Sequence, residues 1–219
     1  MVGRLIRWAL VSLVIGGSVM ALAGEWNSAY LWGMAASVAM LGLWATFRIL
    51  DPELAKERFH PPSAGADAVA LRAIQLSALA TLIFAPLDSG RLNWSPPAPA
   101  ALRVIGLCGF FGASWFTLLA MSTNPFFSSV IRIQSDRGHR VVDKGPYAVI
   151  RHPGYLGMIV LCPMAALGLG SLWALLPACL YSALILRRVV TEDRFLHQHL
   201  PGYGQYAARV RFRVLPYVW

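Results

Sequence analysis

The sequence predicts an all-α integral membrane protein with about six transmembrane helices, including a C-terminal helical hairpin. Hydrophobic residues make up 57% of the 219 residues, and only 13% are charged, about half the charged share that is typical of soluble domains. Several apolar runs are long enough, or nearly so, to cross a hydrocarbon layer that requires about 20 residues. A chain this apolar could not cover its own surface in water, so much of it must face lipid.

Four apolar runs are each predicted to form one membrane-spanning helix. They are Leu5–Ala23, Ala29–Leu50, Ala68–Leu87 and Ala100–Met121. A fifth run extends from Tyr155 to Leu186, which is too long for one span, and it contains Gly168 and Gly170 near its middle. Because glycine permits the backbone conformation that ends a helix, this run predicts a tight hairpin of two short helices.

Basic residues are distributed unevenly between the two ends of these helices. With six spans, only Arg91 and Arg103 of the 19 Lys and Arg residues fall on one side. The positive-inside rule makes the other side cytoplasmic, and both termini lie there. We expect a multi-pass protein of the bacterial inner membrane. The first run resembles a signal peptide, but further spans follow it directly, so we expect it to remain as an uncleaved helix.

Polar residues divide the chain into a four-helix transmembrane region, residues 1–121, and a region 122–219 that carries the candidate chemistry. Within the first region, segment 51–67 begins with Asp-Pro, a pair typical of a helix start, and then carries charges at helical spacing. We expect it to form a short cytoplasmic amphipathic helix. Near the C-terminus, Arg and apolar residues alternate over 209–214, which predicts an extended strip against lipid headgroups.

Several functional classes lack their characteristic motifs. The sequence contains no CxxC pair, HExxH motif, histidine box or GxxxxGK[ST] loop, so we expect no metal site, no disulfide framework and no phosphate-binding loop. The net charge of +9 follows from the topology and from attraction to anionic membrane lipids. Nucleic acid is not an expected partner, and no feature indicates an obligate protein partner.

The stretch GPYAVIRHPGYLG, residues 145–157, is the first candidate site. It enters the hairpin from the cytoplasmic side, and a helix that starts near Pro153 exposes N–H groups that can receive an anionic ligand group. The side chains that could flank a charged or flat ligand are Tyr147, Arg151, His152 and Tyr155. The alternative is structural, because a proline that starts a helix and an arginine at the membrane surface need no ligand.

Arg188 and Glu192 form the second candidate. Their i, i+4 spacing places them on one helix face, where the second helix of the hairpin reaches the cytoplasm. A charged pair near membrane depth commonly lines a polar cavity, although an ordinary helix salt bridge has the same spacing. Asp193 and Arg194 are expected to be solvated neighbours of this pair.

The order of these motifs resembles the isoprenylcysteine carboxyl methyltransferase family and its bacterial relatives, a group that includes phospholipid N-methyltransferases. The resemblance covers 122–219 and rests on Arg-His-Pro-x-Tyr-x-Gly, RxxxE and LPGYGQY. It implies S-adenosylmethionine as cofactor, bound in a cytoplasm-facing pocket by His139, Arg140, Val141, Val142, Tyr147, His152, Pro153, Tyr155 and Glu192. Arg188 matches the family's substrate-side arginine and is the implied catalytic residue, whereas Asp193 replaces the second Glu usual in the family.

The implied reaction is methyl transfer to a lipophilic acceptor, most directly to the carboxylate of an isoprenylcysteine-like or other apolar molecule. Methyl transfer from a sulfonium requires alignment and desolvation but no metal or covalent nucleophile. A phospholipid amine is the alternative acceptor. An NADPH-dependent enzyme similar to sterol reductases is a second alternative, in which Arg137 and Arg140 would bind the 2′-phosphate, and a small transporter or assembly factor is a third.

Overall fold

The computed structural model describes residues 2–48, 57 and 67–219. All regular structure in these ranges is helical. The elements are α1 (Val2–Ala23), α2 (Ala29–Arg48), α4 (Ala68–Pro86), the π-helical turn η1 (Leu87–Leu92), α5 (Ala100–Thr123), the 3₁₀ turns η2 (Ser135–Arg137) and η3 (Gly145–Ala148), α6 (Pro153–Leu169), α7 (Leu175–His199) and α8 (Tyr203–Arg209). The predicted amphipathic helix 51–67 lies outside the described residues except for Glu57 and Asp67.

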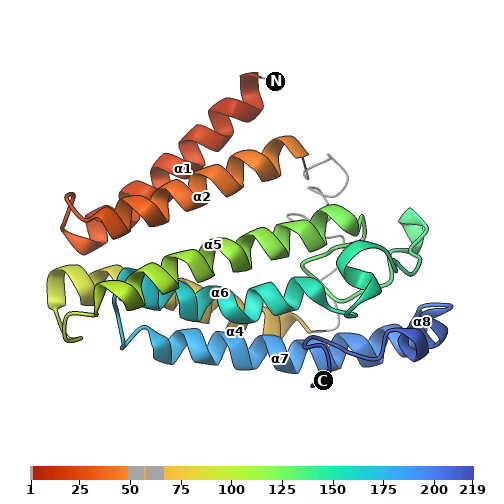
Figure 1. Ribbon diagram of the computed structural model, residues 1–219. Helices are drawn as coiled ribbons and strands as arrows, with labels where there is room; N and C mark the ends of the chain where they lie inside the picture. Colours follow the sequence, from red (N-terminus) through yellow and green to blue (C-terminus); the bar gives the residue numbers. More distant parts are fainter. Residues whose placement is uncertain (1, 49–56, 58–66) are drawn as a thin grey trace.

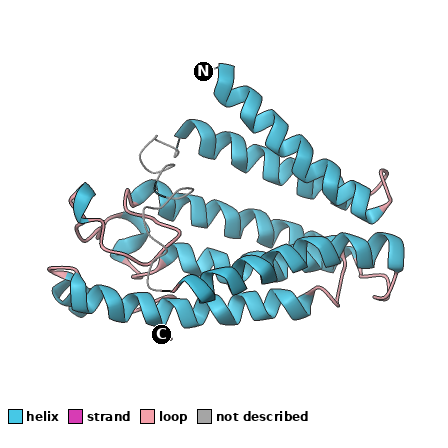
Figure 2. Ribbon diagram, turned by 180° about the vertical axis from the view of Figure 1, so that it is seen from behind, coloured by secondary structure: helices cyan, strands magenta, loops and turns pink. Residues whose placement is uncertain are grey.

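Helices α4 to α7 form a bundle, and α1 and α2 pack together along one side of it (Figure 1). The loops between α5 and α6 gather with α8 and the C-terminal tail at one end of the bundle, as the view from behind also shows (Figure 2). We call this the loop end. The two halves of the predicted site therefore meet there, although the sequence separates them by the whole hairpin.

Within the described residues, four helices are long and apolar enough to cross a membrane: Val2–Ala23, Ala29–Phe47, Ala68–Leu92 and Ala100–Thr123. They correspond to the four single-span runs predicted from the sequence, so that part of the prediction is confirmed. Helix α6 is apolar but has only 17 residues, which gives a length of about 25 Å at 1.5 Å per residue. Six spans and a cytoplasmic loop end stay predictions.

The predicted hairpin is present as α6 and α7. Gly170 ends α6 with φ +85°, a left-handed conformation that glycine adopts without strain. Its N–H donates to the Leu167 carbonyl and the N–H of Ser171 donates to the Ala166 carbonyl, each at 3.0 Å, a pairing typical of glycine-terminated helices. The turn therefore satisfies the last carbonyl groups of α6 before α7 begins.

Glycines allow α5 and α6 to pack closely. A Cβ added at Gly106 would collide with the backbone of Gly168, and one added at Gly157 would collide with Thr117 and the Ala113 carbonyl oxygen. Close backbone approach through small residues is a common way to join membrane helices, because lipid supplies no hydrophobic drive between them. This contact holds the start of α6 in a fixed position against α5.

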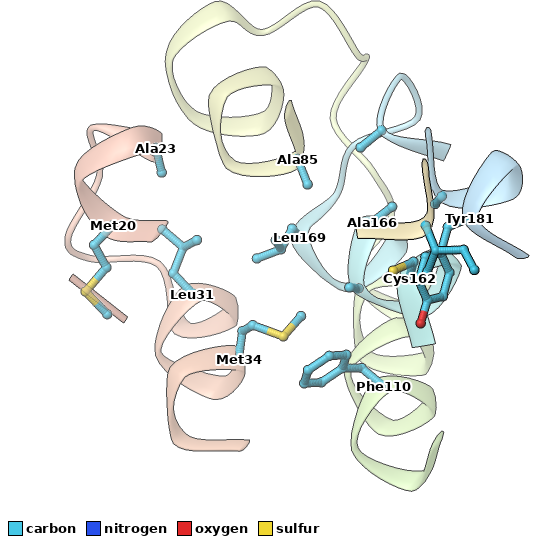
Figure 3. Close-up of a cluster of buried hydrophobic side chains, with 14 of the residues drawn as sticks. Met20, Ala23, Leu31, Met34, Ala85, Phe110, Cys162, Ala166, Leu169 and Tyr181 are labelled. Atoms are coloured by element: carbon cyan, nitrogen blue, oxygen red, sulfur yellow. The ribbon is translucent and has the colours of Figure 1, made fainter. Parts of the chain in front are cut away.

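The main hydrophobic core lies between the α1–α2 pair and the four-helix bundle. Figure 3 shows Met20 and Leu31 from α1 and α2 on one side, and Phe110, Cys162 and Tyr181 from the bundle on the other. Leu169, at the end of α6, lies between the two groups and is 1% exposed. The core thus fixes α1 and α2 against the end of the hairpin.

A buried carboxylate closes the end of the bundle opposite to the loop end. Asp88 is fully buried and accepts hydrogen bonds from the Ser95 N–H at 2.7 Å and from the hydroxyls of Ser95 and Ser171. The Ser95 hydroxyl oxygen in turn accepts from the Leu172 N–H at 2.8 Å. This Asp88 cluster joins the turn after α4 to the hairpin turn.

The C-terminal tail differs from the predicted strip on lipid headgroups. Val210 and Val214 are buried, and backbone N–H groups of Arg151 and His152 donate to the carbonyls of Phe212 and Arg213 at 2.9 and 2.8 Å. The alternating pattern predicts a strip that faces headgroups, but its apolar side packs on protein. The tail is therefore attached to the residues that precede α6.

Candidate cofactor and acceptor site

A cavity of about 330 Å³ lies at the loop end, enclosed by α4, the loop 124–142, the starts of α6 and α8, and the C-terminal half of α7. Its lining includes every predicted cofactor-binding residue except Pro153. The lining members of that set are His139, Arg140, Val141, Val142, Tyr147, His152, Tyr155 and Glu192, and the predicted substrate residue Arg188 also lines the cavity. Pro153 is buried at the first position of α6 and starts that helix.

His152 is held by a buried carboxylate beneath it. Its Nε2 lies 3.2 Å from Asp193 Oδ1 and 3.4 Å from the Tyr203 hydroxyl. Because an ionised carboxylate only accepts hydrogen bonds, Nε2 is the nitrogen that carries the proton. The ring orientation and tautomer of His152 are therefore set by Asp193.

Asp193 is the centre of a buried charge network, so the expectation that it is a solvated neighbour of Glu192 is wrong. Its carboxylate, 3% exposed, accepts from Arg151 at 2.8 and 3.1 Å, from Tyr203 at 2.9 Å and from Arg213 at 2.8 Å. Burial would raise the pKa of Asp193, but the hydrogen bonds from His152, Arg151 and Arg213 hold it well below its usual range. Arg194, in contrast, is exposed as expected.

Arg151 has a structural role: its hydrogen bonds connect three segments of the chain. Besides Asp193, its guanidinium donates to the carbonyls of Val210 and Arg211, both at 2.8 Å. It is 8% exposed, so it does not extend to the membrane surface. Arg151 therefore connects the start of α6, helix α7 and the tail, and His152 next to it is positioned by the same network.

Arg188 and Glu192 are connected through Tyr155. The Arg188 Nε–H donates to the Tyr155 hydroxyl at 3.0 Å, and that hydroxyl donates to Glu192 Oε2 at 2.5 Å. Arg188 also donates from Nη2 to the Ser129 carbonyl at 2.7 Å and is 5% exposed. A shared cavity wall is one of the two arrangements that the i, i+4 spacing allowed. The tyrosine between the two charges could not be inferred from spacing.

The loop before α6 contributes an ordered polar edge. His139 Nδ1 accepts from the Gln134 N–H at 3.3 Å, and its ring lies 4.6 Å from that of Phe126. Burial, followed by the charges of Arg132 and Arg137, lowers the pKa of His139 to about 4, so the ring is neutral at neutral pH. His139 is thus a partly buried wall residue and not a solvated loop histidine.

Glu57 anchors this loop from the segment before α4. It is 4% exposed, and Arg132 donates to its two carboxylate oxygens at 3.0 and 2.6 Å. The hydrogen bond from Arg132 lowers the pKa of Glu57. The pair joins the loop that carries the predicted cofactor contacts to a residue that precedes α4.

The other part of the cavity is apolar. Leu71, Ile74 and Ala78 line it from α4, and Met158 and Tyr181 line it from α6 and α7. These residues lie within the apolar sections of their helices. The cavity thus has a polar part at the loops and an apolar part between α4, α6 and α7. Helix α4 was not among the predicted contributors.

Comparison with known proteins relates one part of the chain to a known family. Residues 104–198, from α5 to the end of α7, match the family model of the isoprenylcysteine carboxyl methyltransferase (ICMT) family. These residues form an ICMT-family domain. The domain contains all the site residues predicted from the sequence.

Two curated relatives extend the comparison. The chain is 28% identical over 123 residues to "Delta(14)-sterol reductase TM7SF2" of Mus musculus, a match covering 54% of this chain and 29% of the relative. It is 29% identical over 135 residues to "Cobalt-zinc-cadmium resistance protein CzcN" of Cupriavidus metallidurans, covering 59% of this chain and 56% of the relative. The chain thus spans between about a third and about half of these relatives.

Parts of the cavity lie outside the ICMT-family domain. Leu71 and Ile74 precede the matched residues, and Tyr203 and Tyr206 follow them. Among residues that the structure describes, no group of three or more His, Cys, Asp or Glu side chains could hold a metal ion.

Proposed function

We propose that this protein transfers a methyl group from S-adenosylmethionine to a lipophilic acceptor, most directly to a carboxylate, at the cytoplasmic face of the membrane. The observation that carries the proposal is the single cavity lined by both the predicted cofactor residues and the predicted acceptor residue, Arg188. The match of residues 104–198 to the ICMT family model supports the same reaction type.

The cavity fits the cofactor by size and by chemistry. Its volume of about 330 Å³ is within the range of about 300–1,000 Å³ of small-molecule sites. The aromatic faces of Phe126 and Tyr147 suit a flat adenine ring, and Glu192 suits an amino or hydroxyl group. When bound, S-adenosylmethionine supplies an activated methyl group on a sulfonium.

The residues of this chain would orient the cofactor and the acceptor and exclude water from them. Asp193 orients His152, and the Glu57–Arg132 pair orients the loop 124–142, so the polar wall is ordered before any ligand enters. Arg188 is the group that would orient an acceptor carboxylate by charge-assisted hydrogen bonds. A carboxylate needs no deprotonation at neutral pH, so no general base is required of the site.

The apolar part of the cavity supports a lipophilic acceptor. An alkyl or prenyl chain beside Leu71, Ile74 and Met158 would lie between helices in the membrane, while its polar group would reach Arg188. The soluble cofactor would enter from the loop end. The excess of basic residues on that side supports a cytoplasmic position by the positive-inside rule.

The test is S-adenosylmethionine binding by calorimetry on detergent-purified protein. We expect micromolar binding by the wild type and at least about tenfold weaker binding by His152→Ala. The variant would remove the proposed hydrogen bond between His152 and the charged cofactor, and such a bond contributes roughly 1.5–3 kcal/mol. His199→Ala is the matched control, since His199 is exposed at the end of α7 and contacts Phe195 of the same helix through a hydrogen bond and ring stacking. No binding by folded wild-type protein would contradict the proposal.

An NADPH-dependent reductase is the second candidate, and the sterol reductase relative favours it. Arg140 lines the cavity and would be available for a 2′-phosphate, but Arg137 donates to Gln134 at 2.6 Å. NADPH carries a second nucleotide half and is far larger than S-adenosylmethionine. Retention of labelled NADPH instead of labelled S-adenosylmethionine by the purified protein would favour this candidate.

A further inference from the structure

The acceptor-side arginine is already occupied by a carboxylate of its own chain. Arg188 uses Nε for Tyr155 and Nη2 for the Ser129 carbonyl, and its Nη1 lies 3.4 Å from Asp67 Oδ2. The two side chains of this ion pair are 4% and 6% exposed. An acceptor carboxylate that approached Arg188 would therefore meet the charge of Asp67.

Asp67 is poorly satisfied in this position. Both of its carboxylate oxygens are buried, and neither accepts a hydrogen bond within the described residues. A buried carboxylate without hydrogen bonds is costly, and a long ion pair compensates that cost only in part. The contact with Arg188 is therefore one that Asp67 can exchange for a better one.

Asp67 has a second possible hydrogen-bonding position, at the start of α4. Asp67 is the N-cap of α4, and its carbonyl accepts the Leu71 N–H at 2.9 Å. Aspartate at this position normally accepts a hydrogen bond from the second or third N–H of the helix. Here the side chain makes no such bond, so the first turn of α4 lacks the cap that its sequence provides.

On the basis of the proposed function, we infer that Asp67 is an exchangeable counter-ion of Arg188 that selects acidic acceptors. Without acceptor, Asp67 balances the buried charge of Arg188. An acceptor carboxylate replaces it on the guanidinium, because two carboxylates so close to one arginine repel each other. Asp67 then turns to the N–H groups of Val69 and Ala70 and caps α4.

Because of this exchange, the site selects acceptors by their negative charge. An acid restores the counter-ion that Arg188 loses, whereas an uncharged amide of the same shape would leave Arg188 paired with Asp67 and gain no ion pair. The exchange also links acceptor binding to the start of α4, the helix that lines the apolar part of the cavity. Acceptor binding and order in the first turn of α4 are therefore expected to change together.

The experiment compares wild type, Asp67→Asn and the control Asp143→Asn. The probes are N-acetyl-S-farnesylcysteine and its carboxamide, with affinities measured by calorimetry in detergent. Asparagine is as good an N-cap as aspartate, so Asp67→Asn retains the helix start but removes the competing charge. Asp143 is half-exposed, pairs with Arg209 at 2.9 Å and lies outside the cavity lining.

We expect Asp67→Asn to bind the acid about tenfold more tightly than wild type, because a like charge near the site is removed. The carboxamide should bind all three proteins alike, and Asp143→Asn should match wild type. In hydrogen exchange, the acid should protect Val69 and Ala70 in wild type. In Asp67→Asn these amides should already be protected without acid.

Equal affinity of wild type and Asp67→Asn for the acid, including no measurable binding by either, would overturn the inference. So would acid binding without added protection at Val69 and Ala70 in wild type. S-adenosylmethionine binding is measured on the same samples. Its absence contradicts the proposed function, whereas its presence together with equal acid affinities contradicts only the role of Asp67.

Discussion

At the residue scale, the Tyr155 hydroxyl decides how the two charged side chains of the site act. It accepts from Arg188 and donates to Glu192, so it separates the two charges and bonds to both. Glu192 faces the proposed cofactor position and Arg188 the proposed acceptor position. Their separate roles can therefore be measured only with each removed in turn.

Glu192→Ala is expected to weaken S-adenosylmethionine binding by roughly tenfold or more, because it removes a charged hydrogen-bond acceptor from the cavity. Arg188→Ala is expected to leave cofactor affinity within a few-fold of wild type and to reduce turnover of a carboxylate acceptor. Calorimetry and a methyl-transfer assay measure the two effects. Unchanged cofactor affinity in Glu192→Ala would remove the role assigned to that carboxylate.

His139 predicts a dependence of stability on pH. Its pKa is about 4 in the folded protein, against 6.5 for an unperturbed histidine. Between these values the unfolded chain binds more protons, so the free energy of unfolding falls as pH falls from 6.5 to 4 and is unaffected above 6.5. The melting temperature should drop more between pH 7 and pH 5 in wild type than in His139→Gln. Equal drops would show that His139 does not titrate in this way.

The sequence could predict individual site residues where motif and chemistry coincide. His152, Tyr155 and Glu192 belong to a recognisable motif, and the structure brings them to one cavity. Asp67 and Asp193 could not be assigned, because each depends on a partner that is distant in sequence. Neighbouring charges on a helix look alike in sequence, and only the packing of the tail buries Asp193 and leaves Arg194 exposed.

At the element scale, the α5–α6 contact fixes the position of the site. Gly106 and Gly168 bring the two backbones together, and Gly154 brings the start of α6 against Phe127 of the cavity loop. The sequence predicted the helices from their apolar runs, but it could not show which glycines serve a turn and which serve packing. Gly170 has a positive φ and ends α6, whereas Gly168, two residues earlier, is a packing position.

Gly106→Ala is expected to destabilise the protein by about 1–3 kcal/mol, because an added Cβ would force α5 away from α6. Gly112→Ala on the same helix is the matched control, since a Cβ there meets nothing within 4 Å. The control should be neutral or slightly stabilising through its helix propensity. Thermal unfolding in detergent measures both variants, and similar melting temperatures for the two would contradict the packing role.

At the scale of the whole molecule, one buried carboxylate joins the elements of the loop end. Asp193 of α7 binds Arg151 before α6, Tyr203 of α8 and Arg213 of the tail. Two of these partners lie beyond the family match, which ends at residue 198. The cavity thus depends on the C-terminal residues as well as on the ICMT-family domain.

Asp193→Asn is expected to cost roughly 3–5 kcal/mol, because it leaves Arg151 as a buried charge without its counter-ion. Asp143→Asn breaks an ion pair whose side chains are 41% and 69% exposed, so its cost should not exceed about 1 kcal/mol. The difference should appear as a much lower melting temperature for Asp193→Asn. A similar small effect of both changes would mean that the network is not essential for stability.

The Asp88 cluster has a consequence for the order of membrane insertion. Asp88 obtains Ser95 as a partner soon after α4 is synthesised, but its bond to Ser171 and the contact from Leu172 require the turn of a hairpin that is made much later. Until that turn arrives, the carboxylate must stay in water, since an ionised group without its partners is expensive in lipid. We therefore expect α4 to settle at its final depth only after α6 and α7 have entered the membrane. A ribosome-stalled Ala85→Cys chain that ends before residue 171 and retains Asp88 should leave the new thiol open to a water-soluble reagent. The complete chain should protect it, because position 85 is fully buried.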